Sequence, residues 1–435
     1  MRKVLIIGYP WPYLTGSKRV MGLARHLPKF GWEPVLLSAP LDEISGSNVR
    51  IIETDYCGFM GSGVRLFGLN SNKDLGSQLK ARHKNTHTRI KAQLRYCFTL
   101  LKEIMAYPDE HRGWYRFAVK DGEEIIRNEH IDAIISTWPV TSHIVAHHLK
   151  RNYKIPWIAD LADLWSQNSA YAFGKFRRKI DENLEKRMLV LADILTTSSQ
   201  PLAERLRFLH NRSSVPDILI GFETDDSDEE KINLTSEFTI TYTGILYKAK
   251  REPSKFFCAL SDLISENALS KDHIQVRFYG PQADWAEHDI AKYKLAGVVR
   301  QHGTVPLSEC LRKQKESQLL LQLNWNDPAE KGVFSGKLLD YLIARRPILA
   351  VGGAGYDEVV KEILAKTKSG VYAPKIEEIK HYLIEAYTEY KNKGEVKYIG
   401  IWEEVQKYSN ENMAIKFASL LDQITKMEAR DPTFC

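Results

Sequence analysis

Short apolar runs alternate with amphipathic helical segments along most of this chain. The first run, at residues 4–7, is followed by an apolar stripe at helical spacing from Val20 to Phe30 and by a second run in EPVLLSAP. Continuous apolar runs are typical of strands buried on both faces, and their alternation with helices predicts a parallel α/β sheet. The β–α–β start predicts a doubly wound, Rossmann-like domain.

The alternation passes through two cycles. Further apolar runs lie at Ile131–Ser136, Trp157–Ala159, Ile194–Thr197 and Ile218–Ile220, and then at Phe238–Tyr242, Val276–Tyr279, Leu319–Leu323 and Ile348–Val351. Between the cycles lies ETDDSDEE, in which six of eight residues are acidic, and such a run is typical of a solvated connection. We therefore expect one domain over residues 1–225 and a second over 226–400, with helices in 401–435 returning to the first.

The helix expected after the run at Leu319–Leu323 carries candidate chemistry at its start. This helix should begin at Ser335 or Gly336, where free backbone N–H groups favour an anion. Lys337 adds a positive charge beside them, and Asp340, one turn further on, can accept hydrogen bonds from vicinal hydroxyls. An anion site beside an acceptor for a diol suits a nucleotide diphosphate attached through ribose.

A second basic group follows the strand expected at 238–242. Ligands of open α/β sheets bind at the carboxyl ends of strands, so a cation after this strand can meet a phosphate. Arg251 is the stronger candidate in the segment 248–251, because its planar guanidinium pairs with phosphate oxygens in a bidentate manner. The alternative is that this segment is a solvated, charged loop.

The segment from 318 to 353 resembles the donor site of family 4 glycosyltransferases, which are retaining, metal-independent enzymes of the GT-B fold. Their usual pattern has two acidic residues with seven residues between them, ahead of a run with Tyr–Leu and a later proline. The second half of that pattern is matched by Asp340, Tyr341, Leu342 and Pro347. The first acidic position falls on Gly332, with Glu330 as the nearest carboxylate, and Arg345 and Arg346 stand where the glycine before the proline is usual.

Other segments extend this resemblance over most of the chain. They lie at 156–165, 184–199, 219–226, 242–253 and 298–309. Ala162 stands where the family usually has arginine, and Ile220 where it usually has asparagine. The resemblance implies an α/β protein of the GT-B fold, with two Rossmann-like doubly wound parallel-sheet domains facing each other across a cleft.

The resemblance also implies roles for individual residues. Asp340 would bind the donor ribose, while Lys337 and Arg251 would be the catalytic cations that stabilise the departing diphosphate. The other nucleotide contacts implied are turn and helix-start residues, namely Gly244, Ser335, Gly336, and Gly16 in the loop after the first strand. Gly303 and Val305 fall in the segment that leads to the nucleotide-base pocket.

His143 is a further catalytic candidate, because it follows the strand expected at 131–136 and so lies near the expected cleft. A histidine there can orient the sugar or donate a hydrogen bond to the acceptor or to a phosphate. As a single residue, it has an equally simple interpretation as a structural histidine.

A strongly basic segment lies between residues 75 and 102. It contains no acid and seven basic residues, Lys80, Arg82, Lys84, Arg89, Lys91, Arg95 and Lys102, with apolar residues at helical spacing. Residues 80–102 would form either a helix with a solvated basic face or a surface for anionic membrane lipids and a lipid-linked acceptor. No nucleic-acid-binding motif accompanies the segment, so we expect no nucleic-acid partner.

Composition and missing motifs restrict the compartment and the classes of enzyme to which this chain can belong. The five cysteines have no paired or metal-ligand spacing, which favours reduced thiols in the cytoplasm. No run approaches the roughly 18 apolar residues of a membrane span, and the first run is too short for a signal peptide. The chain also lacks a Gly-x-Gly-x-x-Gly loop and an acid after the second strand, which argues against a dehydrogenase. No Asp-x-Asp element lies at a strand end, so no metal is expected.

The function implied is transfer of a sugar from a nucleotide-sugar, expected to be a UDP- or GDP-sugar, to a saccharide or lipid-linked acceptor. This would serve surface polysaccharide or glycolipid assembly, in the cytoplasm or at the inner membrane face. The nucleotide-sugar is then a substrate, and no cofactor is needed. Two alternatives stay open: a nucleotide-sugar 2-epimerase of the same fold, and a non-catalytic protein that binds nucleotide-sugars.

Overall fold

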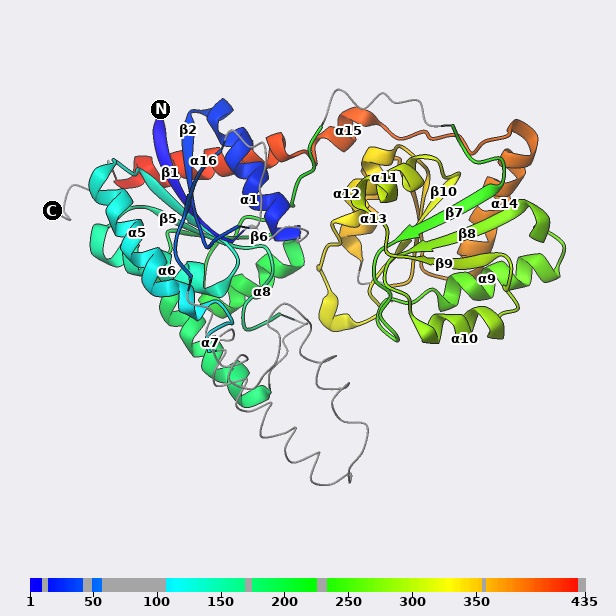
Figure 1. Ribbon diagram of the computed structural model, residues 1–435, viewed down its shortest axis with the longest axis horizontal. Helices are drawn as coiled ribbons and strands as arrows, with labels where there is room; N and C mark the ends of the chain where they lie inside the picture. The colour runs from blue at the N-terminus through cyan, green and yellow to red at the C-terminus, as the bar shows by residue number, and fades with distance from the viewer. Residues whose placement is uncertain are drawn as a thin grey trace, which may run out of the picture. The chain divides into compact units, whose positions relative to one another are not determined.

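The chain divides into two compact units, each built on its own sheet. The computed structural model describes residues 1–9, 15–41, 49–56, 107–168, 174–224, 233–353 and 357–428. Unit 1 comprises Met1–Leu219 and Met413–Cys435, and unit 2 comprises Ile220–Asn412 (Figure 1). The first change of unit thus comes six residues before the boundary expected at 225/226, and the chain returns to unit 1 at Met413 rather than near residue 401. The basic segment 80–102 and most of the acidic run lie outside the described residues.

Unit 1 contains a six-stranded parallel sheet with the order β3-β2-β1-β4-β5-β6. Its strands are β1 (Arg2–Ile7), β2 (Trp32–Ser38), β3 (Arg50–Glu53), β4 (Ala133–Ser136), β5 (Trp157–Leu161) and β6 (Ile194–Thr197). The chain moves outward from β1 to β3 and then returns to the other side of β1 with β4. The carboxyl ends of β1 and β4 therefore form a topological switch point, where such sheets bind ligands.

Helices cover both faces of this sheet. They are α1 (Thr15–His26), α5 (Tyr115–Asn128), α6 (Val140–Tyr153), α7 (Lys175–Leu189), α8 (Gln200–His210) and α16 (Asn410–Glu428), with short 3-10 helices η1 (Leu27–Phe30) and η2 (Arg112–Trp114). Side chains alternate between the faces of a strand. Val4 and Ile6 of β1 accordingly pack with α1 and α16, whereas Leu5 and Ile7 pack with the helices of the other face.

Unit 2 repeats this architecture with a second six-stranded parallel sheet, in the order β12-β11-β10-β7-β8-β9. Its strands are β7 (Phe238–Thr243), β8 (Ile274–Tyr279), β9 (Val299–Gly303), β10 (Leu319–Leu323), β11 (Ile348–Val351) and β12 (Gly370–Ala373). Its helices are α9 (Ser254–Ser265), α10 (Asp284–Lys292), α11 (Leu307–Lys315), α12 (Lys337–Ala344), α13 (Glu358–Thr367), α14 (Ile376–Lys393) and α15 (Trp402–Gln406), with η3 (Lys271–His273) and η4 (Pro328–Glu330).

The strands expected from continuous apolar runs are present, with one exception. The strand expected at Ile218–Ile220 is wrong: this segment is irregular, and the neighbouring Asp217 forms only an isolated bridge with Thr197. Three strands were not anticipated, namely β3, β9 and β12. All three lie at a sheet edge and are partly exposed, so they lack the continuous apolar run of a strand buried on both faces.

Candidate functional site

The central strands of unit 2 create a second topological switch point. β7 pairs with β8 on one side and with β10 on the other, although the chain passes through β8 and β9 before it reaches β10. Gly244 directly follows β7, and α12 follows β10. Because the carboxyl ends of these neighbouring strands meet at one edge of the sheet, segments about ninety residues apart in sequence come together there.

Gly244 and Lys337 lie in close contact at this edge. Gly244 has a φ of +128°, and a Cβ at this position would lie 2.3 Å from Lys337 Nζ. Lys337 Nζ donates a 2.9 Å hydrogen bond to Tyr242 Oη and lies 4.6 Å from the centre of the Tyr242 ring. Any other residue at position 244 would place a Cβ in the space that the end of the Lys337 side chain occupies. The observed position of the Lys337 ammonium therefore requires glycine at 244.

Two cations share this region without a salt bridge between either of them and a described carboxylate. Arg251 is buried, its guanidinium lies 4.0 Å from the centre of the Trp325 ring, and its Nε has no hydrogen-bond partner. Burial, and then the nearby Arg251, lower the pKa of Lys337 well below its usual value, while Asp340 opposes the shift. Burial likewise lowers the pKa of Arg251. An anion bound here would relieve the repulsion between the two cations.

The start of α12 lies slightly later than the sequence indicates. Lys337 is its first residue and Gly336 its N-cap, so Ser335 precedes the helix. No side chain caps this end, and Leu338 N–H instead donates to Ser335 O in a tight turn. Lys337 therefore stands at the positive end of the helix dipole, as a helix-start anion site requires.

Two carboxylates accompany the cations. Asp340 is the fourth residue of α12, is partly exposed, and lies close enough to Lys337 to raise its pKa. Glu330, which the sequence offered as the carboxylate nearest to the first acidic position, is buried in η4 and acts electrostatically on Arg251. Gly332 itself is a left-handed turn residue, with a φ of +86°. The site thus places one carboxylate near each cation.

Gly303 and Val305 lie at another part of the same sheet edge. Gly303 ends β9 with a φ of +78°, and its carbonyl accepts a hydrogen bond from Gly280 N–H. The His302 ring stacks on Tyr279 with a centroid distance of 4.8 Å. β9 is the second strand from β7 in the sheet order. The stacked rings of Tyr279 and His302 therefore lie to one side of the cationic region, along the same edge of the sheet.

In unit 1, His143 is a buried residue of α6. Its Nδ1 and Ser136 Oγ share a 2.7 Å hydrogen bond, and Trp157 Nε1 donates to the same hydroxyl at 2.8 Å. Burial lowers the pKa of His143 to about 4. The ring is therefore neutral at pH 7, and any role in catalysis would be that of a neutral imidazole.

His143 also lines a cavity at the carboxyl ends of β4 and β5. The cavity has a volume of about 340 Å³, and its walls come from 108–111, 138–140, 160–165, His143, Asn168 and Asp181. This volume falls within the range of about 300–1,000 Å³ that is common for small-molecule sites. The cavity lies wholly within unit 1.

The expectation that Gly16 lies in a loop after the first strand is wrong. Helix α1 begins at Thr15, so Gly16 is in its first turn. Arg19, from the same segment, is fully buried in α1 and forms a bidentate pair with Asp160, with Nε–Oδ2 and Nη2–Oδ1 distances of 2.6 and 2.7 Å. Asp160 also accepts a hydrogen bond from Thr196 Oγ1. This ion pair joins α1 to β5 and β6 and has a structural role.

Comparison with known proteins identifies this region. Residues 15–216 match the family model of the glycosyl transferase 4-like domain. We refer to this part of the chain by the name of the model that it matches, the glycosyl transferase 4-like domain. It spans most of unit 1, from α1 to the segment after α8, including the cavity and the buried Arg19–Asp160 pair. No curated protein sequence matches the chain.

Solved structures extend the likeness to both units. Sucrose-phosphate synthase from Thermosynechococcus elongatus has a TM-score of 0.60 at 14% identity, over 98% of this chain and all of that one. Anabaena HepE, solved with UDP and glucose, has a TM-score of 0.58 at 12% identity, over 97% and 100% of the two chains. A glycosyltransferase from Rickettsia africae gives 0.59 at 13%, over 98% and 99%. These likenesses confirm the GT-B fold, with two Rossmann-like doubly wound domains, one of them the glycosyl transferase 4-like domain.

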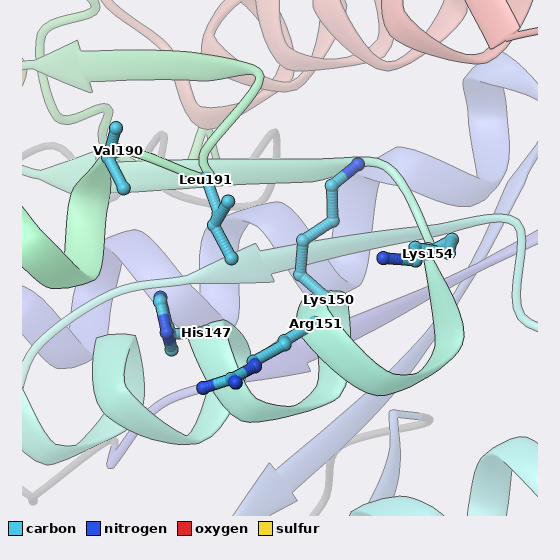
Figure 2. Close-up of a pocket in the computed structure, with 6 residues that line it drawn as sticks. All are labelled: His147, Lys150, Arg151, Lys154, Val190 and Leu191. Carbon is cyan, nitrogen blue, oxygen red and sulfur yellow. The ribbon is translucent and has the colours of Figure 1, made fainter. Parts of the chain in front are cut away.

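A basic hollow lies at the opposite end of α6 in the glycosyl transferase 4-like domain. Figure 2 shows its lining: His147, Lys150 and Arg151 from α6, Lys154 directly after that helix, and Val190 and Leu191 from the turn before β6. Val190 is 64% exposed and Leu191 37% exposed. Lys150 forms a 2.9 Å salt bridge with Asp193. Since α6 runs back to the amino end of β5, this hollow lies away from the carboxyl-end cavity.

Sequence reasoning missed a group of residues near Arg251. Asp357 precedes α13, and burial raises its pKa to about 7, although Arg251 opposes the shift. Asn326 Oδ1 accepts a hydrogen bond from Gly353 N–H, and Gly352 and Gly353 both have positive φ. The pair of glycines directly after β11 was the available signal, since such pairs mark close approach of the backbone to another group.

Within the described residues, no group of three or more His, Cys, Asp or Glu side chains is placed to hold a metal ion. The same residues include no helix with the length and hydropathy needed to cross a bilayer.

Proposed function

We propose that this protein transfers a sugar from a nucleotide-sugar to a saccharide or lipid-linked acceptor in surface polysaccharide or glycolipid assembly. The observation that carries the proposal is the pair of cations at the switch point of unit 2, Lys337 and Arg251, of which neither has a salt bridge to a described residue. The glycosyl transferase 4-like domain and the nucleotide-sugar ligand of the structurally similar HepE support it.

The chemistry follows from the position of these charges. As the bond between sugar and diphosphate breaks, negative charge grows on the leaving phosphate. Lys337, Arg251 and the amino end of α12 are fixed around one point, where they would stabilise that charge without reorganising. Asp340 would accept hydrogen bonds from the ribose hydroxyls. Because these groups supply the stabilisation, we expect activity in the presence of a metal chelator. Retention of configuration is implied by the resemblance to family 4 glycosyltransferases alone, and analysis of the anomeric configuration of the product tests it.

The protein would act in the cytoplasm, in part at the inner membrane face. The basic segment 80–102 lies outside the described residues, but the hollow around Lys150, Arg151 and Lys154 offers cations beside exposed aliphatic side chains. Co-sedimentation with phosphatidylglycerol vesicles measures this association. Binding should weaken in the Lys150→Glu/Arg151→Glu double variant, and equal binding of the variant to anionic and neutral vesicles is expected. Wild-type protein that ignores anionic vesicles would contradict membrane association.

Nucleotide binding tests the donor site. UDP, GDP, ADP and their sugar conjugates are compared by thermal shift and calorimetry, first for wild type. One nucleotide should stabilise the protein selectively, and both Asp340→Asn and Lys337→Met should lose most of that effect. Lys361→Met, which removes an exposed lysine from α13, is the matched control and should bind as wild type does.

The products of the reaction separate the rival functions. A nucleotide-sugar incubated alone and followed by proton NMR should remain unchanged or hydrolyse slowly, and turnover should need an acceptor. An epimerised sugar from the donor alone would identify a 2-epimerase instead. Nucleotide binding without turnover over a broad acceptor panel would identify a non-catalytic binding protein, and no binding at all would refute the donor site.

A further inference from the structure

Tyr242 lies against the end of the Lys337 side chain, but it is fully buried and therefore closed to ligands. It belongs to β7, which pairs with β8 on one side and with β10 on the other. Its ring packs against Phe278 with a centroid distance of 5.4 Å. Strand pairing and core packing fix the place of this ring. Tyr242 can therefore affect a bound donor only through the residues that it contacts.

The phenol of Tyr242 has one hydrogen, and a backbone carbonyl accepts it. Tyr242 Oη donates a 2.9 Å hydrogen bond to Ile245 O, in the turn that contains Gly244. The oxygen therefore presents only lone pairs to Lys337, whose Nζ donates to it at 2.9 Å. Burial raises the pKa of Tyr242, although the nearby Arg251 opposes the shift, so the phenol is neutral at pH 7.

The surroundings of Lys337 both oppose and favour its positive charge. Burial is the largest effect that lowers its pKa, and the nearby Arg251 lowers it further, whereas Asp340 of α12 and Cys310 of α11 raise it. A hydroxyl that can only accept a hydrogen bond favours the ammonium form, which has three N–H donors. The Tyr242 ring, whose centre is 4.6 Å from Nζ, adds attraction for the charged form.

The same hydroxyl also sets where the ammonium lies. The point that a Cβ at residue 244 would occupy is 2.3 Å from Lys337 Nζ and 3.7 Å from Tyr242 Oη. The ammonium therefore rests against both the backbone of Gly244 and the phenol. A lysine side chain is long and flexible, and without such a contact it would sample several positions.

We propose that Tyr242 is a positioning residue of the donor site, which holds the Lys337 side chain in place, as an ammonium group, at the carboxyl end of β7. This inference rests on the proposed function, in which Lys337 meets the diphosphate of the nucleotide-sugar. Tyr242 acts only through Lys337. Without the hydroxyl, the diphosphate would meet a lysine that is more often neutral and less often in place.

Calorimetric titration of the full chain with UDP-glucose, GDP-mannose and ADP-glucose, at pH 6.5 and pH 8.5, tests the proposal. The diphosphates of these probes keep their charge over this range, so a change with pH reports on the protein. Tyr242→Phe retains the ring and removes only the hydroxyl. A lysine that has lost this acceptor should lose its proton at a pH about one to two units lower. Tyr242→Phe should therefore bind about tenfold more weakly than wild type at pH 8.5, with a smaller loss at pH 6.5.

Two further comparisons separate this role from a merely structural one. Tyr390→Phe is the matched control, because Tyr390 is also buried and donates its hydroxyl to a backbone carbonyl, that of Ser236. It should bind the probes as wild type does at both pH values. Lys337→Met should bind weakly without this pH dependence. Tyr242→Phe/Lys337→Met should match it, because the hydroxyl then has no lysine to act on.

Three results would overturn the role of Tyr242 while leaving the donor site intact. They are wild-type affinity in Tyr242→Phe at both pH values, an equal loss at both, or a further loss when Tyr242→Phe is added to Lys337→Met. Wild-type protein that binds none of the three probes would instead refute the donor site, and this inference with it.

Discussion

Replacing Gly244 by alanine tests the link between backbone geometry and the donor site. A Cβ at residue 244 would lie 2.3 Å from Lys337 Nζ and 2.8 Å from Cε. These atoms form the far end of a flexible side chain, so the lysine should swing away while the backbone keeps its course. The variant should therefore fold, with the ammonium displaced from Tyr242 and from the amino end of α12.

The size of the effect can be worked out from these contacts. A hydrogen bond to a charged group contributes about 1.5–3 kcal/mol net, and each 1.4 kcal/mol corresponds to a tenfold change in affinity. Gly244→Ala should therefore weaken nucleotide-sugar binding by about 10- to 100-fold. A side chain at the φ of +128° also strains the backbone, which should lower the free energy of unfolding by about 1–2 kcal/mol.

Isothermal titration with the preferred nucleotide-sugar measures the binding loss, and chemical denaturation measures the strain. Gly297→Ala is the matched control, because Gly297 has a φ of +86° and no heavy atom lies within 4 Å of the point that an alanine Cβ would occupy. It should lose stability without losing affinity. Wild-type affinity in Gly244→Ala, or an equal loss in Gly297→Ala, would show that Lys337 does not hold the donor.

Three further predictions concern buried charges in the two units. His143→Gln should flatten the fall in unfolding free energy between pH 6.5 and 4: the unfolded chain binds a proton there and the buried ring does not, a difference of about 3 kcal/mol in denaturant titrations. Asp357→Asn should stabilise unit 2 more at pH 8 than at pH 5, because the raised pKa of Asp357 means stability is lost as pH rises towards and through 7; equal shifts in melting temperature at both values would contradict this. Arg19→Met should cost about 3–5 kcal/mol by leaving Asp160 buried without its partner, and adding Asp160→Asn should recover part of the loss in denaturation experiments.

Strands could be predicted where both faces of the sheet are covered. The β1 sequence buries Val4, Leu5, Ile6 and Ile7 completely and is a continuous apolar run there. β10 is buried along its whole length and is apolar except for Gln322. β3 and β12 lie at sheet edges, where part of each strand faces solvent and the run breaks up. The segment 218–220 shows the converse error: Ile218 packs into the core of unit 1, but the segment forms no ladder of strand hydrogen bonds.

The candidate site also has some features that could be predicted from the sequence and others that could not. Strand ends and helix starts are local features, and they were enough to single out Gly244, Lys337 and Asp340 as neighbours of one sheet edge. The roles of these residues in binding the donor stay predictions. Whether a polar residue faces a ligand or a partner inside the fold depends on distant segments, so Gly16 was placed in a loop that is a helix.

By itself, the sequence determined the class of fold, since the order of apolar runs and amphipathic helices fixes which segments must be buried in parallel sheets. Only the tertiary structure decided which charged side chains form salt bridges with each other and which do not. Arg19 and Asp160, 141 positions apart, neutralise each other, whereas Lys337 and Arg251 meet without a salt bridge to a described residue. Electrostatic interactions depend on distance and burial in space, and neither is contained in the spacing of residues along a chain.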